Sequence, residues 1–407
     1  MPRVKHKANF QQSAMPVMPE KSQLATAQTE KSTSSPVRPS AHLYFVNAPV
    51  DFLVIGLASI IMYVAMVLLY QGQSVVWAGQ LAFAMQIVIN HPHFAATNYR
   101  LYHNKENIMQ YPITALVIPW LVLAAMIGSF LSPTFIAVIF FKIFLFWSPY
   151  HFSGQTLGIT LIYARRAGFF VGKWERFTLS NLIYSSFLFM TARGDMITAA
   201  SDLVLPVQYD VEQYRLGLPD WVPNVILVWM IVNGLGFITL VIKWCKEQGR
   251  MIPAIVLLPV FTQLIWFIPG SFCPSFYLFV PMFHSLQYLL IAWSLQLKEK
   301  MDVEKITPSV GYVVKESLRW GGINLLLGSI LFWGIPQAMY FIFKNEFELN
   351  YSYLFVLGII VAGVQVHHFF VDGVIWKLKK KTVASPLMVN LDDLIHPPAV
   401  MQPARGV

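Results

Sequence analysis

Long apolar stretches recur along this chain, and they largely decide what it can fold into. A stretch of about 18 or more apolar residues can cross a bilayer as a helix, and within hydrocarbon only helices and closed barrels satisfy every backbone polar group. We therefore expect an all-α protein, a polytopic transmembrane helical bundle of about ten spans. The predicted spans lie at 50–70, 75–96, 112–130, 133–153, 177–192, 222–243, 252–270, 276–296, 322–343 and 352–376.

The span at 177–192 is the shortest of these. The span at 133–153 could continue past a break at Ser148-Pro149, because residues 156–164 are apolar again. Proline removes a backbone donor and clashes with the preceding turn, which is why a break is expected there.

The basic residues predict the orientation of the spans. With a cytoplasmic N-terminus, 25 of the 29 Lys and Arg residues fall in inner segments. Three lie in outer loops (Arg193, Arg215 and Lys344), and Lys142 lies within a span. Because Lys and Arg concentrate on the cytoplasmic side, both termini are predicted to be cytoplasmic. The net charge of +9 then reflects topology and not nucleic-acid binding. We expect a multi-pass integral protein of a bacterial inner membrane.

Polar segments flank the apolar region. Residues 1–45 are rich in Ser, Thr, Gln, Pro and Lys and contain no apolar core of a signal peptide, so they predict a disordered basic tail. Residues 46–381 form the predicted transmembrane domain, and 382–407 a C-terminal cytoplasmic tail. The two cysteines, Cys245 and Cys273, show neither metal-ligand spacing nor a disulfide framework.

Histidines are concentrated in the apolar segments. Seven of the ten lie in or at the edge of such segments, where a polar group is costly and usually functional. The predicted second, fourth, eighth and tenth spans carry them, and all four run from outside to inside, so the groups share one depth near the cytoplasm. Imidazole suits iron, copper and zinc. We expect a buried metal centre whose ligands are His91, His93, His151, His284, His367 and His368.

Two pairs set conditions on that centre. His368 and Asp372 are four residues apart and share a helical face, so Asp372 could bind the metal or orient His368. His367 points about 100° away from His368, so both contribute directly only if two ions are bound. His91 and His93 would diverge on a regular helix, but Pro92 disfavours helical geometry at His91, and a bend would let both reach one ion.

Other polar residues could assist. Gln155 shares a helical face with His151, and Gln287 with His284, so each glutamine could hydrogen-bond a ring nitrogen or a metal-bound water. Asp372, Gln155 and Gln287 are therefore the candidate catalytic residues. His103 could be a surface histidine or a further ligand, and Tyr288 an ordinary membrane tyrosine or a proton or electron relay.

The motifs His-Pro-His-Phe, His-Phe-Ser-Gly-Gln, Phe-His-Ser-Leu-Gln-Tyr and His-His-Phe-Phe-Val-Asp-Gly resemble those of a group of histidine-rich polytopic bacterial membrane proteins. The resemblance covers most of spans two to ten and implies no particular activity. Membrane di-iron desaturases and hydroxylases use His-x3-His and His-x2-His-His boxes, which are absent here. The Brp/Blh carotene-cleaving dioxygenases are similar only in strategy, since their intramembrane histidines hold iron.

These features favour a metal-dependent membrane oxidoreductase, resembling an oxygenase or desaturase in its chemistry. The expected cofactor is iron, as one or two ions, with copper or zinc as alternatives. The expected partners are the lipid bilayer, a lipophilic substrate that enters from it, and an electron donor. The alternatives are a metal-ion or proton-coupled transporter, for which the sequence shows no convincing internal repeat, and a haem-binding electron-transfer protein.

Overall fold

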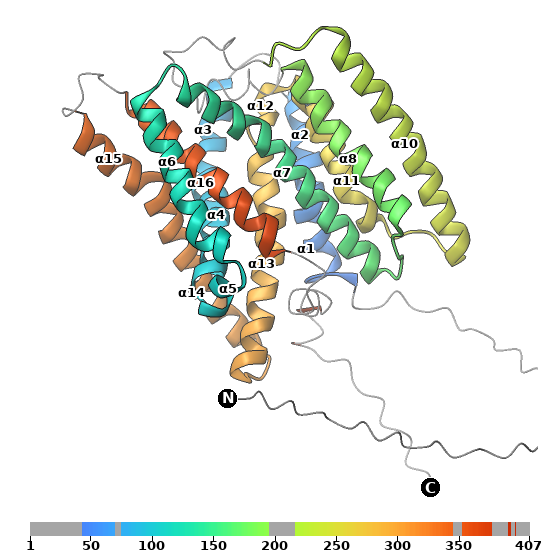
Figure 1. Cartoon of the computed structure of the whole chain (residues 1–407). Coiled ribbons are helices and arrows are strands. Elements are labelled where there is room, and N and C mark those ends of the chain that lie inside the picture. The colour runs from blue at the N-terminus through green and yellow to red at the C-terminus, as the bar shows by residue number, and fades with distance from the viewer. Residues whose placement is uncertain are drawn as a thin grey trace, which may run out of the picture. The chain divides into compact units, whose positions relative to one another are not determined.

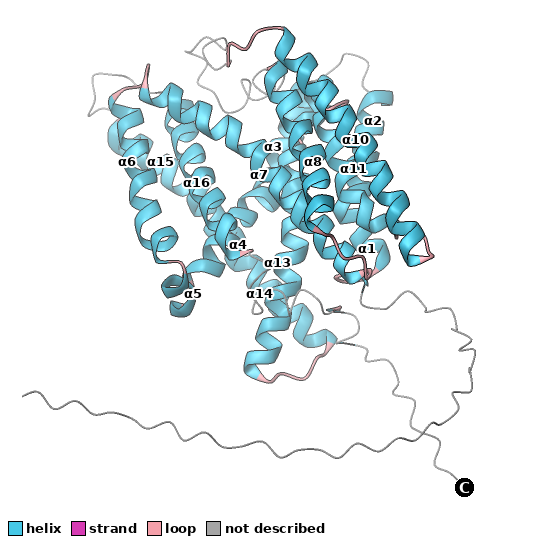
Figure 2. Cartoon of the chain, turned by 45° about the vertical axis from the view of Figure 1, so that its right-hand side comes forward, coloured by secondary structure: helices cyan, strands magenta, loops and turns pink. Residues whose placement is uncertain are grey.

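The computed structural model describes residues 43–69, 75–194, 216–344, 352–376, 390, 391 and 395. All regular structure in these residues is helical (Figure 2), as the apolar pattern predicts. The tail predicted at 1–45 and the tail predicted at 382–407 lie almost entirely outside the described residues, as does most of the predicted outer loop at 193–221.

Eight stretches of the described chain form helices long and apolar enough to cross a membrane, which supports an integral membrane protein. Two further predicted spans, 75–96 and 177–192, are helical but are not among the eight. The number of spans and their orientation remain predictions. The eight stretches are Ala48–Leu68, Ile113–Leu131, Ile136–Arg166, Trp221–Gln248, Ala254–Phe272, Ser275–Glu304, Val310–Ile342 and Tyr353–Ile375.

The first half of the chain ends with two long helices, α7 and α8. The expected break at Pro149 does not occur: α7 is one continuous helix of 31 residues with Pro149 inside it. The elements of this half are α1 (Ala48–Phe52), η2 (Leu53–Leu57), α2 (Ala58–Leu69), α3 (Val75–Met85), η3 (Gln86–Asn90), α4 (His91–Tyr102), α5 (Lys105–Gln110), η4 (Ile113–Val117), α6 (Ile118–Leu131), α7 (Ile136–Arg166) and α8 (Lys173–Arg193).

The second half contains the most deeply buried helices. In an apolar window of 18 residues, 72% of the stretch that contains α13 and 61% of α16 is buried. The corresponding shares are 17% for α10 and for the stretch that begins with α14, so α13 and α16 are interior helices. The elements are α10 (Trp221–Gln248), α11 (Ala254–Phe267), η6 (Gly270–Phe272), α12 (Pro274–Tyr277), α13 (Val280–Glu304), α14 (Val310–Ser329), η7 (Ile330–Gly334), α15 (Ile335–Phe343) and α16 (Tyr353–Ile375).

Three prolines follow widened helical turns and do not end the helices. The π-helical segments η3, η4 and η7 are each followed by a proline at the second position of the next helix: Pro92, Pro119 and Pro336. A π-helical turn hydrogen-bonds i to i+5, which gives room for a residue that has no N–H and would crowd a regular turn. The chain therefore stays helical from α3 through η3 into α4.

Four helices from distant parts of the sequence pack together at the centre of the described bundle. In Figure 1, α16 lies near α4, α6 and α7, and it makes direct contacts with all three. α13 contacts α4, η3 and η2. A largely aromatic core that includes Phe140, Phe144, Trp266, Phe283 and Phe355 fills the space among these helices. This packing places side chains of α4, α7, α13 and α16 in one interior region.

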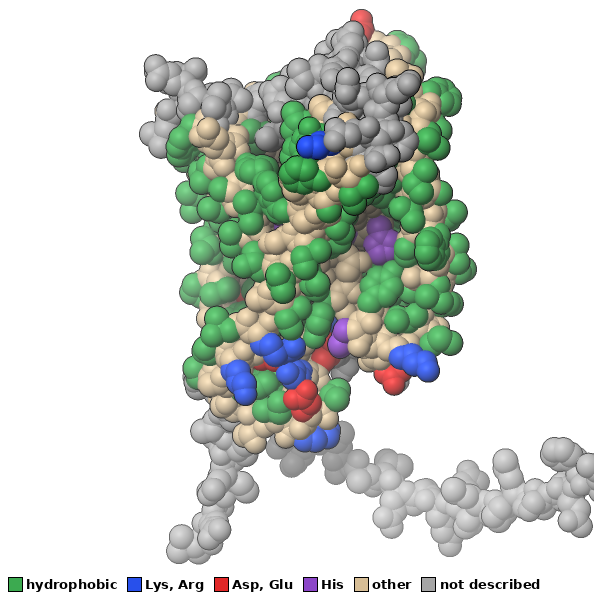
Figure 3. All heavy atoms as spheres, turned by 90° about the vertical axis from the view of Figure 1, so that its left-hand side faces the viewer, with side chains coloured by type: hydrophobic (Ala, Val, Ile, Leu, Met, Phe, Trp, Pro, Cys, Tyr) green, Lys and Arg blue, Asp and Glu red, His purple; other side chains and the backbone are tan. Residues whose placement is uncertain are grey.

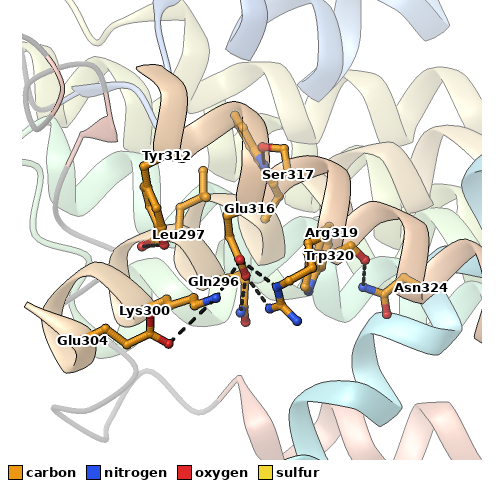
Figure 4. A network of polar contacts seen from close by, with 11 residues as sticks. Gln296, Leu297, Lys300, Glu304, Tyr312, Glu316, Ser317, Arg319, Trp320 and Asn324 are labelled. Atoms are coloured by element: carbon orange, nitrogen blue, oxygen red, sulfur yellow. Dashed lines mark hydrogen bonds and ion pairs between the residues drawn. The ribbon is translucent and has the colours of Figure 1, made fainter. Parts of the chain in front are cut away.

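Charged side chains gather at one end of the face shown in Figure 3. Arg100 of α4 pairs with Glu299 of α13 through two nitrogen–oxygen contacts of 3.0 and 2.9 Å. The α13–α14 hairpin is fixed by Glu316, which is 3% exposed and accepts hydrogen bonds from Lys300 (2.7 Å), Arg319 (2.7 and 2.5 Å) and Gln296 (3.3 Å) (Figure 4). These contacts hold the ends of α4, α13 and α14 together.

α14 lies close to the backbone of α4 at Gly328. A Cβ atom on Gly328 would lie 2.7 Å from the carbonyl carbon of His91, which is backbone and cannot rotate away. We expect Gly328→Ala to lower the free energy of unfolding by about 1–3 kcal/mol, because α14 must shift away from α4. The thermal unfolding midpoint of the detergent-purified protein measures this.

Gly321→Ala and Gly322→Ala are the matched controls. Both glycines lie on α14, and a Cβ on either meets nothing within 4 Å. Since alanine is the better helix former by about 1 kcal/mol, these variants should be as stable as the wild type or slightly more so. Equal midpoints for all three variants would show that the close approach at Gly328 contributes nothing.

Candidate metal centre

Four helices each place one histidine at a common point. His93 lies in α4, His151 in α7, His284 in α13 and His368 in α16. Each offers one ring nitrogen, and these four nitrogens all lie within 4.8 Å of one another. The predicted convergence of histidines from separate spans is confirmed for these four residues.

The spacing of the nitrogens is close to that of a metal site. Nitrogens bound to one ion at about 2.0–2.1 Å lie about 3–4 Å from one another. The Nε2 atoms of His151 and His368 are already 3.2 Å apart. Since no pair is separated by more than 4.8 Å, small ring movements of about 1 Å or less would bring all four within bonding distance of one ion.

The ring nitrogens of this group are buried and largely unpartnered. His93 and His368 are 0% exposed and His284 is 2% exposed. Neither ring nitrogen of His93 or His284 has a hydrogen-bond partner among the described residues, and nor does Nδ1 of His368. Buried polar groups are almost always paired, because an unpaired one costs about 1–3 kcal/mol. A metal ion can bind one nitrogen of each ring, so it would provide a partner for part of this unpaired set.

Asp372 lies beside this group. Its Oδ2 lies 3.4 Å from Nε2 of His368 and 3.6 Å from Nε2 of His151. An outer carboxylate that orients a histidine contacts the nitrogen that does not bind metal. Asp372 instead lies beside the two Nε2 atoms that face each other. Of the two roles predicted for it, this geometry favours a direct ligand.

The other oxygen of Asp372 contacts Thr97, which the sequence analysis did not select, and Thr97 in turn contacts Tyr288, for which that analysis left a relay role open. The Thr97 hydroxyl oxygen lies 3.1 Å from Oδ1 of Asp372 and 2.6 Å from the Tyr288 hydroxyl. Thr97 has one proton to donate, and both Oδ1 of Asp372 (3.1 Å) and the His93 carbonyl (3.3 Å) can accept it. With that proton given to either acceptor, the Tyr288 hydroxyl donates to Thr97, and the shorter contact favours an arrangement that runs from Tyr288 through Thr97 to Asp372. The Tyr288 ring also meets the His93 ring edge to face, at 4.2 Å between centroids.

The two glutamines hydrogen-bond to backbone carbonyls and to each other, and not to imidazole nitrogens. Gln155 donates to the carbonyl of His284 (2.9 Å) and to Oε1 of Gln287 (3.2 Å). Gln287 donates to the carbonyl of Ile55 in η2 (2.6 Å). The predicted hydrogen bonds from glutamine to imidazole are absent among the described residues. Gln155 and Gln287 instead tie α7, α13 and η2 together behind the histidines.

His91, His367 and His103 lie outside the four-histidine group. The His91 ring stacks on Phe332 of η7, with centroids 4.2 Å apart and planes 3° from parallel. The expected bend at Pro92 does not form: His91 has helical φ and ψ of −63° and −43°, so its ring diverges from that of His93. Nε2 of His367 lies 3.3 Å from the Tyr102 hydroxyl, and the His103 ring stacks on Tyr99.

No protein-family model, curated protein or solved structure matches this chain. The resemblance to histidine-rich bacterial membrane proteins therefore depends on the sequence motifs alone, and the function has to be argued from the site.

Proposed function

We propose that His93, His151, His284 and His368, together with Asp372, bind one transition-metal ion, and that the ion is iron. The observation that carries this proposal is a set of buried imidazoles from four helices whose nitrogens converge but have few hydrogen-bond partners. Imidazole and carboxylate donors suit iron, and also zinc and copper. Four neutral rings and one carboxylate would leave a divalent ion with a net charge of about +1, which reduces the cost of burying it.

We further propose that the protein is a membrane oxidoreductase acting on a lipophilic substrate. Aromatic side chains surround the imidazoles: Phe94 packs against His368, Phe152 against His284 and Phe369 against His151, at 4.2–4.8 Å between ring centroids. Such walls favour an apolar reactant over a polar one. Iron held by these five side chains would supply redox chemistry with dioxygen.

The geometry supports an enzyme better than the two alternatives. A transporter would be expected to spread its polar groups along a path through the membrane, whereas these histidines meet at one point. A haem would need a flat slot between its two axial ligands. The ring centroids of His93 and His368 are 4.4 Å apart, and those of His151 and His284 are 5.0 Å apart. Both separations are too short for a haem plane to lie between the rings.

Elemental analysis of the detergent-purified full chain tests the metal centre. We expect about one iron ion per chain that survives dialysis and exchanges slowly with added radioactive iron, because a closed histidine site releases metal only when its ligands separate. Protein that stays metal-free after reconstitution with iron, copper or zinc would contradict the proposal. Rapid exchange coupled to metal flux into liposomes would favour transport instead.

A further inference from the structure

Tyr288 is the only tyrosine or tryptophan among the described residues whose ring contacts the four histidines. Its ring centroid lies 4.2 Å from that of His93 and 6.2 Å from that of His368. The other aromatic rings against these histidines belong to phenylalanines: Phe94, Phe152 and Phe369. A benzene ring has no O–H to lose and is far harder to oxidise than a phenol. Tyr288 is therefore the nearest side chain that can give an electron to the metal centre.

The hydrogen bonds of Tyr288 provide a path for its proton. A phenol that loses an electron becomes a strong acid, so its proton has to leave at the same time. The Tyr288 hydroxyl donates to the Thr97 oxygen at 2.6 Å, and that oxygen lies 3.1 Å from Oδ1 of Asp372. Tyr288 can therefore lose one electron and one proton without releasing the proton into an apolar interior.

Trp376 continues the row of rings away from the metal centre. It follows directly after the last residue of α16 and is half-buried. The ring centroids of Trp376 and Tyr288 are 5.3 Å apart and their planes meet at 88°, the geometry of an edge-to-face aromatic contact. The guanidinium of Arg100 lies 5.2 Å from the centroid of the Trp376 ring. Trp376 thus connects Tyr288 to Arg100.

A polar pocket lies on the other side of Arg100. It encloses about 680 Å³, within the roughly 300–1,000 Å³ of small-molecule sites. Its lining includes Arg100, Asn107, Gln296, Glu299 and Ile375. Arg100 follows Thr97 by three residues, about one helical turn, and Ile375 has the same spacing from Asp372. Because its lining is rich in charged and amide side chains, the pocket suits a water-soluble molecule. Such a molecule would be separated from Trp376 by one side chain.

We propose that Tyr288 and Trp376 carry electrons, one at a time, to the metal centre from a small water-soluble reductant in this pocket. Tyr288 gives one electron to the centre and its phenol proton to Thr97, which passes its own hydroxyl proton to Asp372. Trp376 then gives an electron to Tyr288, and the protons return along the same hydrogen bonds. The reductant restores Trp376 and is itself oxidised by one electron.

Two short steps are favoured over one long step because the rate of electron transfer falls steeply with distance. The row of contacts from Arg100 through Trp376 and Tyr288 to His93 supplies such steps. The inference rests on the proposed oxidoreductase, since the oxidant is the metal centre after its reaction with dioxygen.

Electron paramagnetic resonance of the iron-loaded full chain, mixed with dioxygen and rapidly frozen, tests the relay. We expect a tyrosyl radical whose spectrum narrows when the protein contains ring-deuterated tyrosine and which is absent from Tyr288→Phe. Ascorbate should remove this radical about tenfold more slowly in Trp376→Phe than in the wild type, which corresponds to about 1.4 kcal/mol in the barrier. Trp293→Phe is the matched control, because Trp293 packs against the same cluster as Tyr288 but hydrogen-bonds Ser317 of α14.

Iron content measured on the same samples separates the relay from the metal centre. A full complement of iron without a radical that depends on Tyr288 overturns the relay and leaves the metal centre standing. Equal ascorbate rates in the wild type and Trp376→Phe, or equal slowing in Trp376→Phe and Trp293→Phe, also overturn the relay. Protein that binds no iron contradicts the metal centre itself, and the relay with it.

Discussion

Replacing His93 or His368 by alanine is expected to remove the metal from the purified protein. Both side chains are 0% exposed and each supplies one of the four converging nitrogens. Loss of an outer hydrogen-bond partner of a metal ligand typically lowers affinity about 10- to 100-fold, and loss of a ligand should cost more. Metal analysis after dialysis, followed by competition with a chelator of known affinity, measures the change.

His91→Ala and His367→Ala are matched controls for this experiment. Each lies on the same helix as a proposed ligand, only one or two residues away, and each loses the same atoms. Because His91 stacks on Phe332 and His367 contacts Tyr102, both variants should keep the wild-type metal content. Equal metal loss in all four variants, or in none of them, would contradict the four-histidine site.

The helical bundle was predictable because the length of each apolar stretch can be read directly from the sequence. A stretch such as 352–376 has to be helical in hydrocarbon whatever its neighbours are, and α16 covers Tyr353–Ile375. The convergence of His93, His151, His284 and His368 followed from their similar predicted depth. The pair formed by His368 and Asp372 followed from the helical repeat alone.

The sequence interpretation was wrong at Pro92 because a widened turn was not considered. A break there would have let His91 and His93 reach one ion, but η3 absorbs the proline and the helix continues to Tyr102. Residues two apart on a helix are about 200° apart, so only His93 joins the group. The predicted span ended at residue 96, which also hid Thr97, one turn beyond His93.

The roles of the glutamines could not be predicted because they depend on which helices are neighbours. Gln155 and Gln287 share faces with histidines as expected, but a long amide side chain bonds whatever acceptor is near. Here those acceptors are the carbonyls of His284 and Ile55, and Ile55 lies more than 200 residues from Gln287 in the sequence. Nothing in the local pattern indicates that η2 packs against α13.

Thr97→Val is expected to lower metal affinity about 10- to 100-fold, the range seen when an outer partner of a ligand is lost. Valine keeps the shape of threonine but cannot donate to Oδ1 of Asp372 or accept from the Tyr288 hydroxyl, which lie 3.1 and 2.6 Å from the Thr97 oxygen. Asp372 would then be free to turn away from His151 and His368. Chelator competition and the rate of metal release measure this effect.

Thr97→Ser distinguishes positioning of the carboxylate from simple packing. Serine keeps the hydroxyl and loses only the methyl group, so it should restore most of the metal affinity, although removing a buried methyl group costs about 1 kcal/mol of stability. A packing role predicts the reverse order, with valine close to wild type and serine impaired. Equal metal affinity in the wild type and Thr97→Val would show that Asp372 depends neither on Thr97 nor on the hydrogen bond that Tyr288 donates to Thr97.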